Sequence, residues 1–530
     1  MVTSALTRRA LSRVAERRGE YVAAGAWSGE PLDLLAAPVR RSPSAIAVAD
    51  RHERLTYAHL DELASAAASS MRSRGVAEGD PVLLVVENDV SSVILIHAAL
   101  RTGALAMVAP LSAGASQLAD IVAHTAPALA VGPESLVGHQ RVPGARWAAT
   151  ASLRKGEPVR APSSDRPADE PAVVIFTSGT TSRPKGVVHS LSTLTAASRN
   201  YIDGAELAPD DRLFVVSPLA SVTGILQAVT VTPMLGAEVV LETKWDPRAT
   251  CDLLLETGGT FFGGPDLLLG QLLDEVERRG LDRVTLTATY LGGTMLDPRI
   301  LERAERDFGI IVMRAYGSSE APISSAGRRH ESRERRLADD GAPLAHVQVR
   351  SGSAADPAEC CIRGPHLFLG YVHDEDDDHA FEDGWFRTGD VADLSGGRVR
   401  IVGRIRDIVI RKGMKVPISE VEGYVNELPG VLRSAGYSVP DPETSERLAM
   451  AVILQPGVCA DVVLDVHSMG EALTGAGLAK WKLPEELVVW TEDFPQNAAG
   501  KILRNELQER SGGRPRALAA RLRQDKDDTR

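Results

Sequence analysis

Apolar and polar positions alternate between residues 56 and 311 in a way that predicts short strands separated by helices. Short runs rich in Val, Ile and Leu predict strands, and longer stretches with helical spacing of apolar positions predict helices. The predicted strands are 81–86, 105–108, 128–131, 172–176, 213–216, 238–241, 260–262, 286–291 and 310–313. The predicted helices are 90–102, 222–235, 247–257, 266–279 and 298–308. This regular alternation predicts an α/β fold in which helices cover parallel sheets.

Beyond residue 340 helical stretches become rarer, and short strands predicted at 348–350, 359–362 and 399–402 indicate a β-rich subdomain. A chain of 530 residues exceeds what one hydrophobic core normally serves, so more than one domain is expected. The expected parts are a variable N-terminal tail at 1–30, a large domain at 31–403, a hinge at 404–407, a small mobile C-terminal α/β domain at 408–511 and a tail at 512–530. Both tails are expected to be frayed.

The strongest chemical signal is the loop T-S-G-T-T-S-R-P-K-G at 177–186, which directly follows the strand at 172–176. Glycine lets the backbone approach an anion, successive amides form an anion-binding nest, and Lys185 adds positive charge. The loop is not the GxxxxGK[ST] phosphate loop, because Lys185 follows a proline and precedes Gly186 and Val187. A flexible surface turn is the alternative interpretation. The strand before the loop and the lysine after it favour binding of a nucleotide triphosphate.

This loop resembles the signature T-S-G-T-T-G-x-P-K-G of the acyl-CoA synthetases of the adenylate-forming, AMP-binding superfamily, with Ser182 in place of a glycine. Four further segments resemble the family's other motifs in the family order. They are Y-G-S-S-E at 316–320, G-W-F-R-T-G-D at 384–390, G-R-I-R-D at 403–407 and P-Q-N-A-A-G-K-I-L-R at 495–504. The resemblance covers most of the chain and is strongest to cyclohexanecarboxylate-CoA ligases and medium-chain acyl-CoA synthetases.

The resemblance implies three catalytic residues. Lys185 holds the phosphates of ATP, Glu320 holds Mg2+ together with Thr177, and Lys501 bridges the substrate carboxylate and the α-phosphate. Asp390 binds the ribose, and a carboxylate that accepts two O–H donors suits a cis diol. The implied ATP and AMP contacts are Thr177, Ser178, Gly179, Thr180, Thr181, Lys185, Gly293, Tyr316, Gly317, Ser319, Asp390 and Arg404.

The resemblance also implies a second catalytic step. Arg406 matches the hinge residue, and Gly413 with Lys415 belongs to the step that forms the thioester. The positions that border the acyl pocket are Ser221, Val222, Gly224, Gly292, Ala321 and Pro322. They are small or apolar and carry no fixed charge, which favours a neutral organic acid over an amino acid. Ser221 replaces a histidine found in many relatives, which leaves the thiol acceptor open.

The implied reaction joins a medium-chain, alicyclic or aromatic acid to CoA through an acyl-adenylate, with release of AMP and pyrophosphate. Two alternatives remain. One is an adenylating ligase that loads an acyl carrier protein, which a basic surface around Arg411 and Lys412 would favour. The other is a noncatalytic nucleotide-binding protein, against which the presence of Lys185, Glu320 and Lys501 speaks. A homodimer is a further open possibility.

Composition restricts partners and location. A net charge of −12 argues against nucleic acid as a generic partner. No apolar stretch approaches the roughly 18 residues that cross a bilayer, and the N-terminus lacks the apolar region of a secretory signal. The cysteines at 251, 360, 361 and 459 have no metal-ligand spacing, which predicts a reducing, cytoplasmic location and no structural metal.

Overall fold

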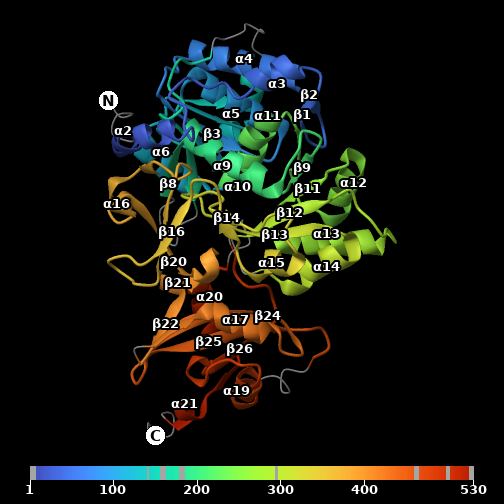
Figure 1. The fold of residues 1–530 in the computed structure, drawn as a ribbon, viewed down its shortest axis with the longest axis vertical. Coiled ribbons are helices and arrows are strands. Elements are labelled where there is room, and N and C mark those ends of the chain that lie inside the picture. Colours follow the sequence, from blue (N-terminus) through green and yellow to red (C-terminus); the bar gives the residue numbers. More distant parts are fainter. Residues whose placement is uncertain are drawn as a thin grey trace. The chain divides into compact units, whose positions relative to one another are not determined.

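The chain divides into two compact units (Figure 1). The computed structural model describes residues 7–139, 142–154, 163–177, 185–292, 296–412, 414–458, 465–496 and 502–524. The first unit comprises Met1–Arg350, Cys361–Arg387 and Ser395–Val399, and the second comprises Ser351–Cys360, Thr388–Leu394 and Arg400–Arg530. The predicted hinge at 404–407 therefore lies just inside the last stretch of the second unit.

One sheet of the first unit carries the ends of the glycine-rich loop. Its strands follow the order β18-β8-β7-β4-β3-β5-β6. They are β18 (Gly370–Tyr371), β8 (Lys185–Ser190), β7 (Pro171–Thr177), β4 (Leu105–Pro110), β3 (Pro81–Val86), β5 (Leu129–Gly132) and β6 (Trp147–Ala149). The inner strands β7, β4, β3 and β5 are parallel, as predicted, whereas β8 is antiparallel to both β7 and β18.

A second sheet of the first unit has the order β15-β14-β13-β12-β11-β9-β10-β1-β2. Its strands are β15 (Ala342–Pro343), β14 (Ser325–Ala326), β13 (Ile311–Tyr316), β12 (Ala288–Gly292), β11 (Phe261–Gly263), β9 (Arg212–Val215), β10 (Glu238–Leu241), β1 (Ile46–Ala49) and β2 (Arg54–Thr56). The strands from β13 to β1 are parallel, and the edges at β14, β15 and β2 are antiparallel. The predicted α/β class is therefore confirmed, with antiparallel edges that the alternation did not predict.

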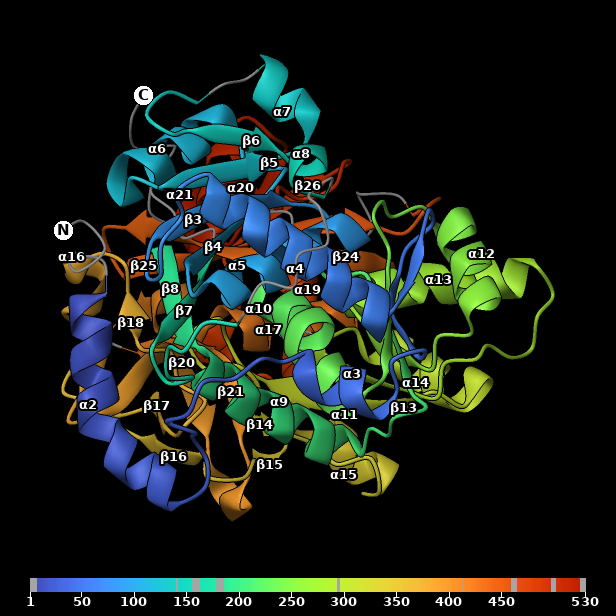
Figure 2. The ribbon, with the colours of Figure 1, turned by 90° about the horizontal axis from the view of Figure 1, so that it is seen from above.

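Helices connect these strands and cover the sheets. In the first unit they are α2 (Arg8–Ala23), α3 (Ala36–Arg41), α4 (Tyr57–Ser73), α5 (Val90–Thr102), α6 (Ala115–Thr125), α7 (Glu134–His139), α8 (Thr150–Arg154), α9 (Leu191–Ala205), α10 (Val222–Ile225), η1 (Leu226–Val231), α11 (Thr232–Leu235), α12 (Pro247–Thr257), α13 (Asp266–Arg278), α14 (Pro298–Phe308), α15 (Arg333–Ala338), α16 (Asp374–Asp377) and η2 (Ser395–Gly397). Figure 2 shows α12, α13 and α14 in the same region of the first unit, and α13 packs against both of the others. The predicted helix at 222–235 contains the π-helical turn η1 between α10 and α11.

Local signals set the ends of these helices. Asp89 precedes α5, and its side chain accepts a hydrogen bond from the backbone N–H of Ser92 at 2.7 Å. Gly103 ends α5 with a φ of 74°, a left-handed conformation in which glycine has no steric penalty. The observed bounds of α5 are those predicted from the sequence.

The remaining strands belong to two sheets. One contains β16 (Gln348–Ser351), β17 (Glu359–Arg363), β19 (Phe381–Glu382), β20 (Trp385–Asp393) and β21 (Arg400–Arg404). The other has the order β23-β22-β25-β26-β27, with β24 beside β25. Its strands are β22 (Ile408–Arg411), β23 (Met414–Pro417), β24 (Val431–Asp441), β25 (Ser445–Leu454), β26 (Glu486–Trp490) and β27 (Arg516–Leu518). The helices of the second unit are η3 (Ile405–Asp407), α17 (Ile418–Asn426), α19 (Val466–Gly475), η4 (Lys480–Lys482), α20 (Arg504–Ser511) and α21 (Ala520–Gln524).

The described parts of the two predicted tails contain regular structure. Helix α2 buries Val14 and Tyr21, and Arg13 of the same helix pairs with the fully buried carboxylate of Asp377. At the other end β27 pairs with β26 in antiparallel register. An arginine-rich composition alone does not reveal a buried carboxylate, such as that of Asp377, that pairs with an arginine in the folded chain.

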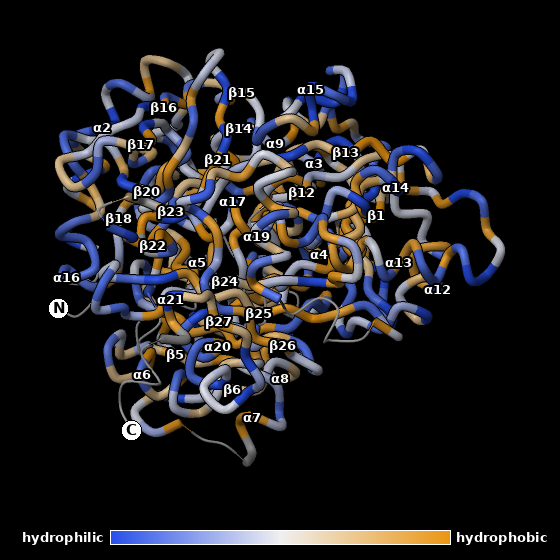
Figure 3. The backbone as a smooth tube through the Cα atoms, turned by 90° about the horizontal axis from the view of Figure 1, so that it is seen from below, coloured by the Kyte–Doolittle hydropathy of each residue, from blue (hydrophilic) through white to orange (hydrophobic). Residues whose placement is uncertain are grey.

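Hydrophobic segments gather along the strands, and hydrophilic colour marks helices such as α15 and α16 (Figure 3). Among the residues that the structure describes, no helix combines the length and hydrophobicity needed to span a bilayer. The three described cysteines, Cys251, Cys360 and Cys361, are buried and unbridged. Buried cysteines of this kind behave as small hydrophobic core residues.

Candidate active site

The two ends of the glycine-rich loop are held together by a β-hairpin. Thr177 ends β7 and Lys185 begins β8, and the two residues are partners in the antiparallel register. The Thr177 hydroxyl donates to the carbonyl oxygen of Lys185 at 3.4 Å. The loop residues at 178–184, which include the predicted contacts Ser178, Gly179, Thr180 and Thr181, lie outside the described residues. The hairpin therefore places both ends of the loop at the carboxyl end of β7, where open α/β sheets bind ligands.

Lys185 is half-buried and already interacts with an acidic and an aromatic side chain. Its Nζ lies 3.3 Å from Oδ1 of Asp376, on α16. The same Nζ lies 5.1 Å from the centre of the Tyr371 ring, within the range of a cation–π interaction. The ammonium group is therefore oriented by the protein before any phosphate binds.

Glu320 lies against the same tyrosine. The Tyr371 hydroxyl donates to Oε1 of Glu320 at 2.7 Å, and the backbone N–H of Phe368 donates to the carbonyl oxygen of Glu320 at 2.8 Å. Burial and the negative charge of Glu320 raise the pKa of Tyr371 well above its ordinary value. The phenol therefore stays protonated and remains a donor to the carboxylate. Lys185 and Glu320, predicted from separate motifs, thus meet at one side chain.

The loop that carries Glu320 follows β13, which ends at Tyr316. The backbone N–H of Ser318 donates to the carbonyl oxygen of Ala321 at 3.1 Å. Gly317 allows this tight path, because an added Cβ would lie 2.5 Å from the backbone nitrogen of Ile323. The predicted nucleotide contacts Tyr316, Gly317 and Ser319 therefore lie on one ordered turn.

His189 supports this turn and was not predicted from the sequence. Its Nε2 lies 2.8 Å from the carbonyl oxygen of Ser319, and its Nδ1 lies 3.0 Å from Oγ1 of Thr193. Burial lowers the pKa of His189 to about 4, so the ring is neutral near pH 7. The Nε2–H then donates to the carbonyl while Nδ1 accepts from the threonine. His189 lies four residues after Lys185, but no spacing signal links it to the turn at 316–320.

The predicted ribose ligand lies in the second unit. Asp390 is on β20 and pairs in antiparallel register with Arg404 on β21. Nε of Arg404 lies 3.1 Å from Oδ1 of Asp390, and the Asp390 side chain is only 7% exposed. The backbone N–H of Asp390 donates to Oγ1 of Thr388 at 3.0 Å. The structure thus joins two residues that were assigned separately to nucleotide binding.

Five further predicted residues belong to segments that are described in part or not at all. Lys501, Gly293 and Gly413 lie outside the described residues. The backbone of Arg406 forms part of η3, and the backbone of Lys415 pairs with Ile410 between β23 and β22. The roles assigned to these five residues stay predictions.

The predicted acyl-pocket positions have clear local roles. Ser221 caps α10, because its Oγ accepts from the N–H of Gly224 at 3.1 Å and donates to the carbonyl oxygen of Pro218 at 2.6 Å. Gly224 is required there, since an added Cβ would lie 2.3 Å from that carbonyl oxygen. Val222 is the first residue of α10. The serine that replaces the expected histidine thus has a capping function of its own.

The other predicted acyl-pocket positions lie at the ends of β12 and β13. Gly292 ends β12, and an added Cβ would lie 2.1 Å from the carbonyl oxygen of Ala315. Ala321 and Pro322 are buried on the turn after β13. All three are uncharged, and they lie on or after β12 and β13, which are neighbouring strands of one sheet.

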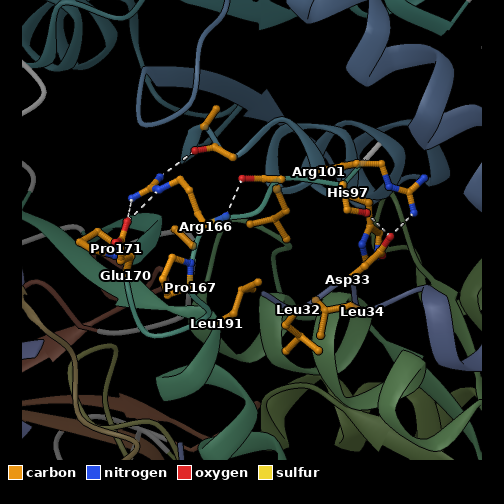
Figure 4. Close-up of a pocket in the computed structure, with 16 residues that line it drawn as sticks. Leu32, Asp33, Leu34, His97, Arg101, Arg166, Pro167, Glu170, Pro171 and Leu191 are labelled. Carbon is orange, nitrogen blue, oxygen red and sulfur yellow. Dashed lines mark hydrogen bonds and ion pairs between the residues drawn. The ribbon is translucent and has the colours of Figure 1, made fainter. Parts of the chain in front are cut away.

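A cavity of about 40 Å³ lies at the start of β7, the end of that strand away from the glycine-rich loop (Figure 4). It is lined by Pro171 at the start of that strand and by Arg101, which pairs with Asp33 at 2.9 Å and Asp61 at 2.6 Å. Thr177 is at the other end of β7, roughly 20 Å away for an extended strand. This cavity is large enough for a few water molecules only. It is therefore not the nucleotide site.

Comparison with known proteins extends this description. The model of the AMP-binding enzyme family matches residues 35–372. The chain is 28% identical to the medium-chain fatty-acid–CoA ligase of Escherichia coli (strain K12), with 92% of this chain and 91% of that protein covered. It is also 28% identical to the feruloyl-CoA synthase of an Amycolatopsis species, covering 90% of this chain and 98% of that protein.

Solved structures share the fold. ATP-bound MatB from Rhodopseudomonas palustris aligns with a TM-score of 0.81 and 24% identity, covering 90% of this chain and 98% of that one. The o-succinylbenzoate CoA synthetase MenE from Bacillus subtilis, in complex with its acyl-adenylate, aligns with a TM-score of 0.79 and 21% identity, over 90% and 98% of the two chains. Because the family model matches more than half of the 530 residues, the resemblance noted in the motifs is confirmed, and the chain belongs to the AMP-binding enzyme family.

Proposed function

We propose that this AMP-binding enzyme is an acyl-CoA ligase that activates a neutral organic acid with ATP and transfers the acyl group to CoA. The observation that carries the proposal is the convergence of Lys185 and Glu320 on Tyr371, because it brings a phosphate-binding cation beside a metal-binding carboxylate. The names of the relatives support the same reaction, since they include medium-chain fatty-acid–CoA ligase and feruloyl-CoA synthase.

In the first step the acid attacks the α-phosphate of ATP to give acyl-adenylate and pyrophosphate. Two anions must approach one another, so positive charge supplies most of the stabilisation. Lys185 binds the phosphates, and the backbone amides and hydroxyls of the loop after Thr177 complete the contact. Asp390 accepts the ribose hydroxyls, while Arg404, 3.1 Å away, holds that carboxylate in place. Lys501 then bridges the acid and the α-phosphate.

The residues present also suit Mg2+ carried by the nucleotide. Mg2+ is usually bound through one or two carboxylates together with substrate phosphates. Within the described part of the chain no cluster of three or more His, Cys, Asp or Glu side chains could hold a metal by itself. Glu320 is the carboxylate assigned to the metal, and so few protein ligands fit a metal that arrives with ATP. When bound, Mg2+ would neutralise charge on the phosphates, and the Thr177 hydroxyl is a further oxygen donor.

In the second step the thiol of CoA attacks the acyl carbonyl carbon. The C–S bond forms, the C–O bond to the phosphate of AMP breaks, AMP leaves, and the thiol proton is lost to water. We assign Gly413 and Lys415 to this step. We assign Arg406 to the hinge about which the C-terminal domain rotates between the first and the second step. The separation of the chain into two units supports such a division of labour. Residues for both steps then belong to the second unit, which carries Lys501 as well.

The acid is proposed to be a medium-chain, alicyclic or aromatic carboxylic acid. No charged side chain occurs among the assigned pocket positions Ser221, Val222, Gly224, Ala321 and Pro322. The hydroxyl of Ser221 is already engaged in the cap of α10, so it does not offer a free donor to a polar substrate. An amino acid would need a carboxylate to bind its ammonium group.

Free CoA is favoured over a carrier protein as acceptor. The carrier-protein alternative would be supported by a basic surface at Arg411 and Lys412. Arg411 pairs with Glu485 at 2.8 Å and Lys412 pairs with Glu443 at 2.9 Å, so both charges are neutralised locally. A carrier-protein partner and a homodimer stay predictions.

The test is an acid-dependent assay of both half-reactions over short, medium-chain, alicyclic and aromatic acids. Exchange between pyrophosphate and ATP measures adenylation, and AMP release with CoA measures the full reaction. We expect one acid class to give both, and Lys501→Ala to lower exchange by about 10² to 10³. Exchange without CoA consumption would favour a carrier protein. No acid-dependent exchange with any class would contradict the proposed function.

A further inference from the structure

Tyr371 is the one side chain that touches both of the charged groups assigned to ATP and its metal among the described residues. Its hydroxyl donates to Oε1 of Glu320 at 2.7 Å, and its ring faces Nζ of Lys185 at 5.1 Å. Tyr371 is 8% exposed, whereas the Lys185 side chain that it contacts is 31% exposed. None of the motifs that identify the nucleotide site includes this residue.

The position of Tyr371 is itself set by the backbone. Tyr371 belongs to β18 and pairs with Val187 of β8, two residues after Lys185. Its backbone N–H donates to Oδ1 of Asp377 at 3.1 Å, and its ring meets the Phe368 ring edge to face at 4.9 Å. A side chain held in this way loses little freedom when ATP binds, which is the requirement for a preorganised site.

The two contacts serve opposite charges. The O–H group of a phenol stabilises a carboxylate, while the face of its ring attracts a cation. Without the hydroxyl, Glu320 would be free to rotate away from the position in which it faces a metal. Without the ring, Lys185 would lose one of its two restraints and keep only the ion pair with Asp376.

We propose that Tyr371 is the positioning residue of the phosphate and metal site, orienting Glu320 through its hydroxyl and Lys185 through its ring. This inference rests on the proposed function, because it takes Glu320 as the metal ligand and Lys185 as the phosphate ligand. The inference adds Tyr371 to the proposed site and gives two parts of its side chain different roles. The hydroxyl governs the part of nucleotide binding that depends on the metal, and the ring governs the part that does not.

The experiment compares Tyr371→Phe with Tyr371→Leu by calorimetry, using the α,β-methylene analogue of ATP with Mg2+ and again with EDTA. We expect Tyr371→Phe to weaken binding about tenfold with Mg2+, the effect of losing a hydrogen bond to a charged group, and to leave binding in EDTA unchanged. Tyr371→Leu should weaken binding under both conditions. Tyr57→Phe is the matched control, since the buried Tyr57 hydroxyl donates to the carbonyl oxygens of Thr232 and Ala237.

The outcomes separate this inference from the proposed function. Equal weakening by Tyr371→Phe with and without Mg2+, or no weakening, would overturn the positioning role. Glu320→Gln serves as the reference, because it should abolish the gain in affinity that Mg2+ gives. If Glu320→Gln abolishes the gain in affinity that Mg2+ gives and Tyr371→Phe leaves that gain unchanged, only the positioning role fails. If the unaltered protein binds the analogue no better with Mg2+ than in EDTA, the assignment of Glu320 fails.

Discussion

At the scale of single residues, the site is built from side chains that are far apart in the sequence. Tyr371 meets Glu320 across 51 positions, and His189 meets the Ser319 carbonyl across 130. The motifs predicted Lys185 and Glu320 as site residues, because the family that they resemble has particular residue types at these positions. The motifs could not identify Tyr371, Asp376 or His189, because their contributions are contacts that exist only after the chain folds.

One prediction concerns the carboxylate that now pairs with Lys185. If phosphates bind Lys185, Asp376 competes with them and repels them, so Asp376→Asn should lower the KM for ATP by about two- to fivefold. Lys185→Met should instead lower pyrophosphate exchange by about 10² to 10³. Steady-state exchange at varied ATP concentrations measures both effects. An increase of the ATP KM in Asp376→Asn would show that Asp376 supports nucleotide binding instead of competing with it.

A second prediction concerns the acid stability of the protein. The pKa of His189 falls from an ordinary value of 6.5 to about 4 on folding, because burial disfavours the cation. Below pH 6.5 the unfolded chain therefore binds a proton that the folded chain does not bind until about pH 4. As the pH falls from 6.5 to 4, the free energy of unfolding should fall by about 1 kcal/mol per pH unit from this group alone. Below pH 4 the contribution of this group should level off. His189→Gln should reduce that slope in urea unfolding measured between pH 4 and 7, and an unchanged slope would argue against a buried neutral ring.

At the scale of elements, apolar periodicity predicted the bounds of many strands and helices closely. Strand β3, helix α5 and helix α14 have the predicted ends, where cap residues and glycines coincide with changes in pattern. The antiparallel strand β8 was not predicted, because its partner β7 and the loop between them decide that it turns back. The π-helical turn η1 leaves the apolar pattern of the helix unchanged, so the pattern does not reveal it.

The N-terminal helix gives a prediction at this scale. Arg13 of α2 pairs with Asp377, whose side chain has no exposed surface and which also accepts the N–H of Tyr371. Arg13→Gln should leave this carboxylate poorly compensated and lower the stability of the first unit by about 2 to 4 kcal/mol. Urea unfolding, with Arg8→Gln at an exposed position of the same helix as the control, measures the difference. Equal effects of the two substitutions would mean that the Arg13–Asp377 pair adds no stability of its own.

At the scale of the whole molecule, two compact units follow from the size of the chain. The first carries Lys185 and Glu320, and the second carries Asp390 and Arg404 as well as the sheet that follows the predicted hinge. The β-α alternation predicted the parallel interiors of the two large sheets. It did not predict that the second unit also takes residues 351–360 and 388–394.

The hinge gives the prediction that belongs to this scale. Arg406 lies in η3, at the start of the C-terminal part of the second unit. Proline fixes φ and removes a backbone donor, so Arg406→Pro should restrict movement at this point. We expect pyrophosphate exchange to be retained and thioester formation from preformed acyl-adenylate to be lost. Equal loss of both activities would contradict a hinge role.

The sequence by itself determined the α/β class and the family, and it predicted the charged residues of the candidate site, because these depend on local periodicity and on residue types at fixed spacing. Only the tertiary structure decided that Lys185 and Glu320 both contact Tyr371 and that Asp376 forms an ion pair with Lys185. It also decided that Arg404 pairs with Asp390 and that α2 is part of the first unit's core. The physical reason is that such contacts join segments distant along the chain, and their geometry is set by sheet order and burial. Neither property is encoded in any short stretch of sequence.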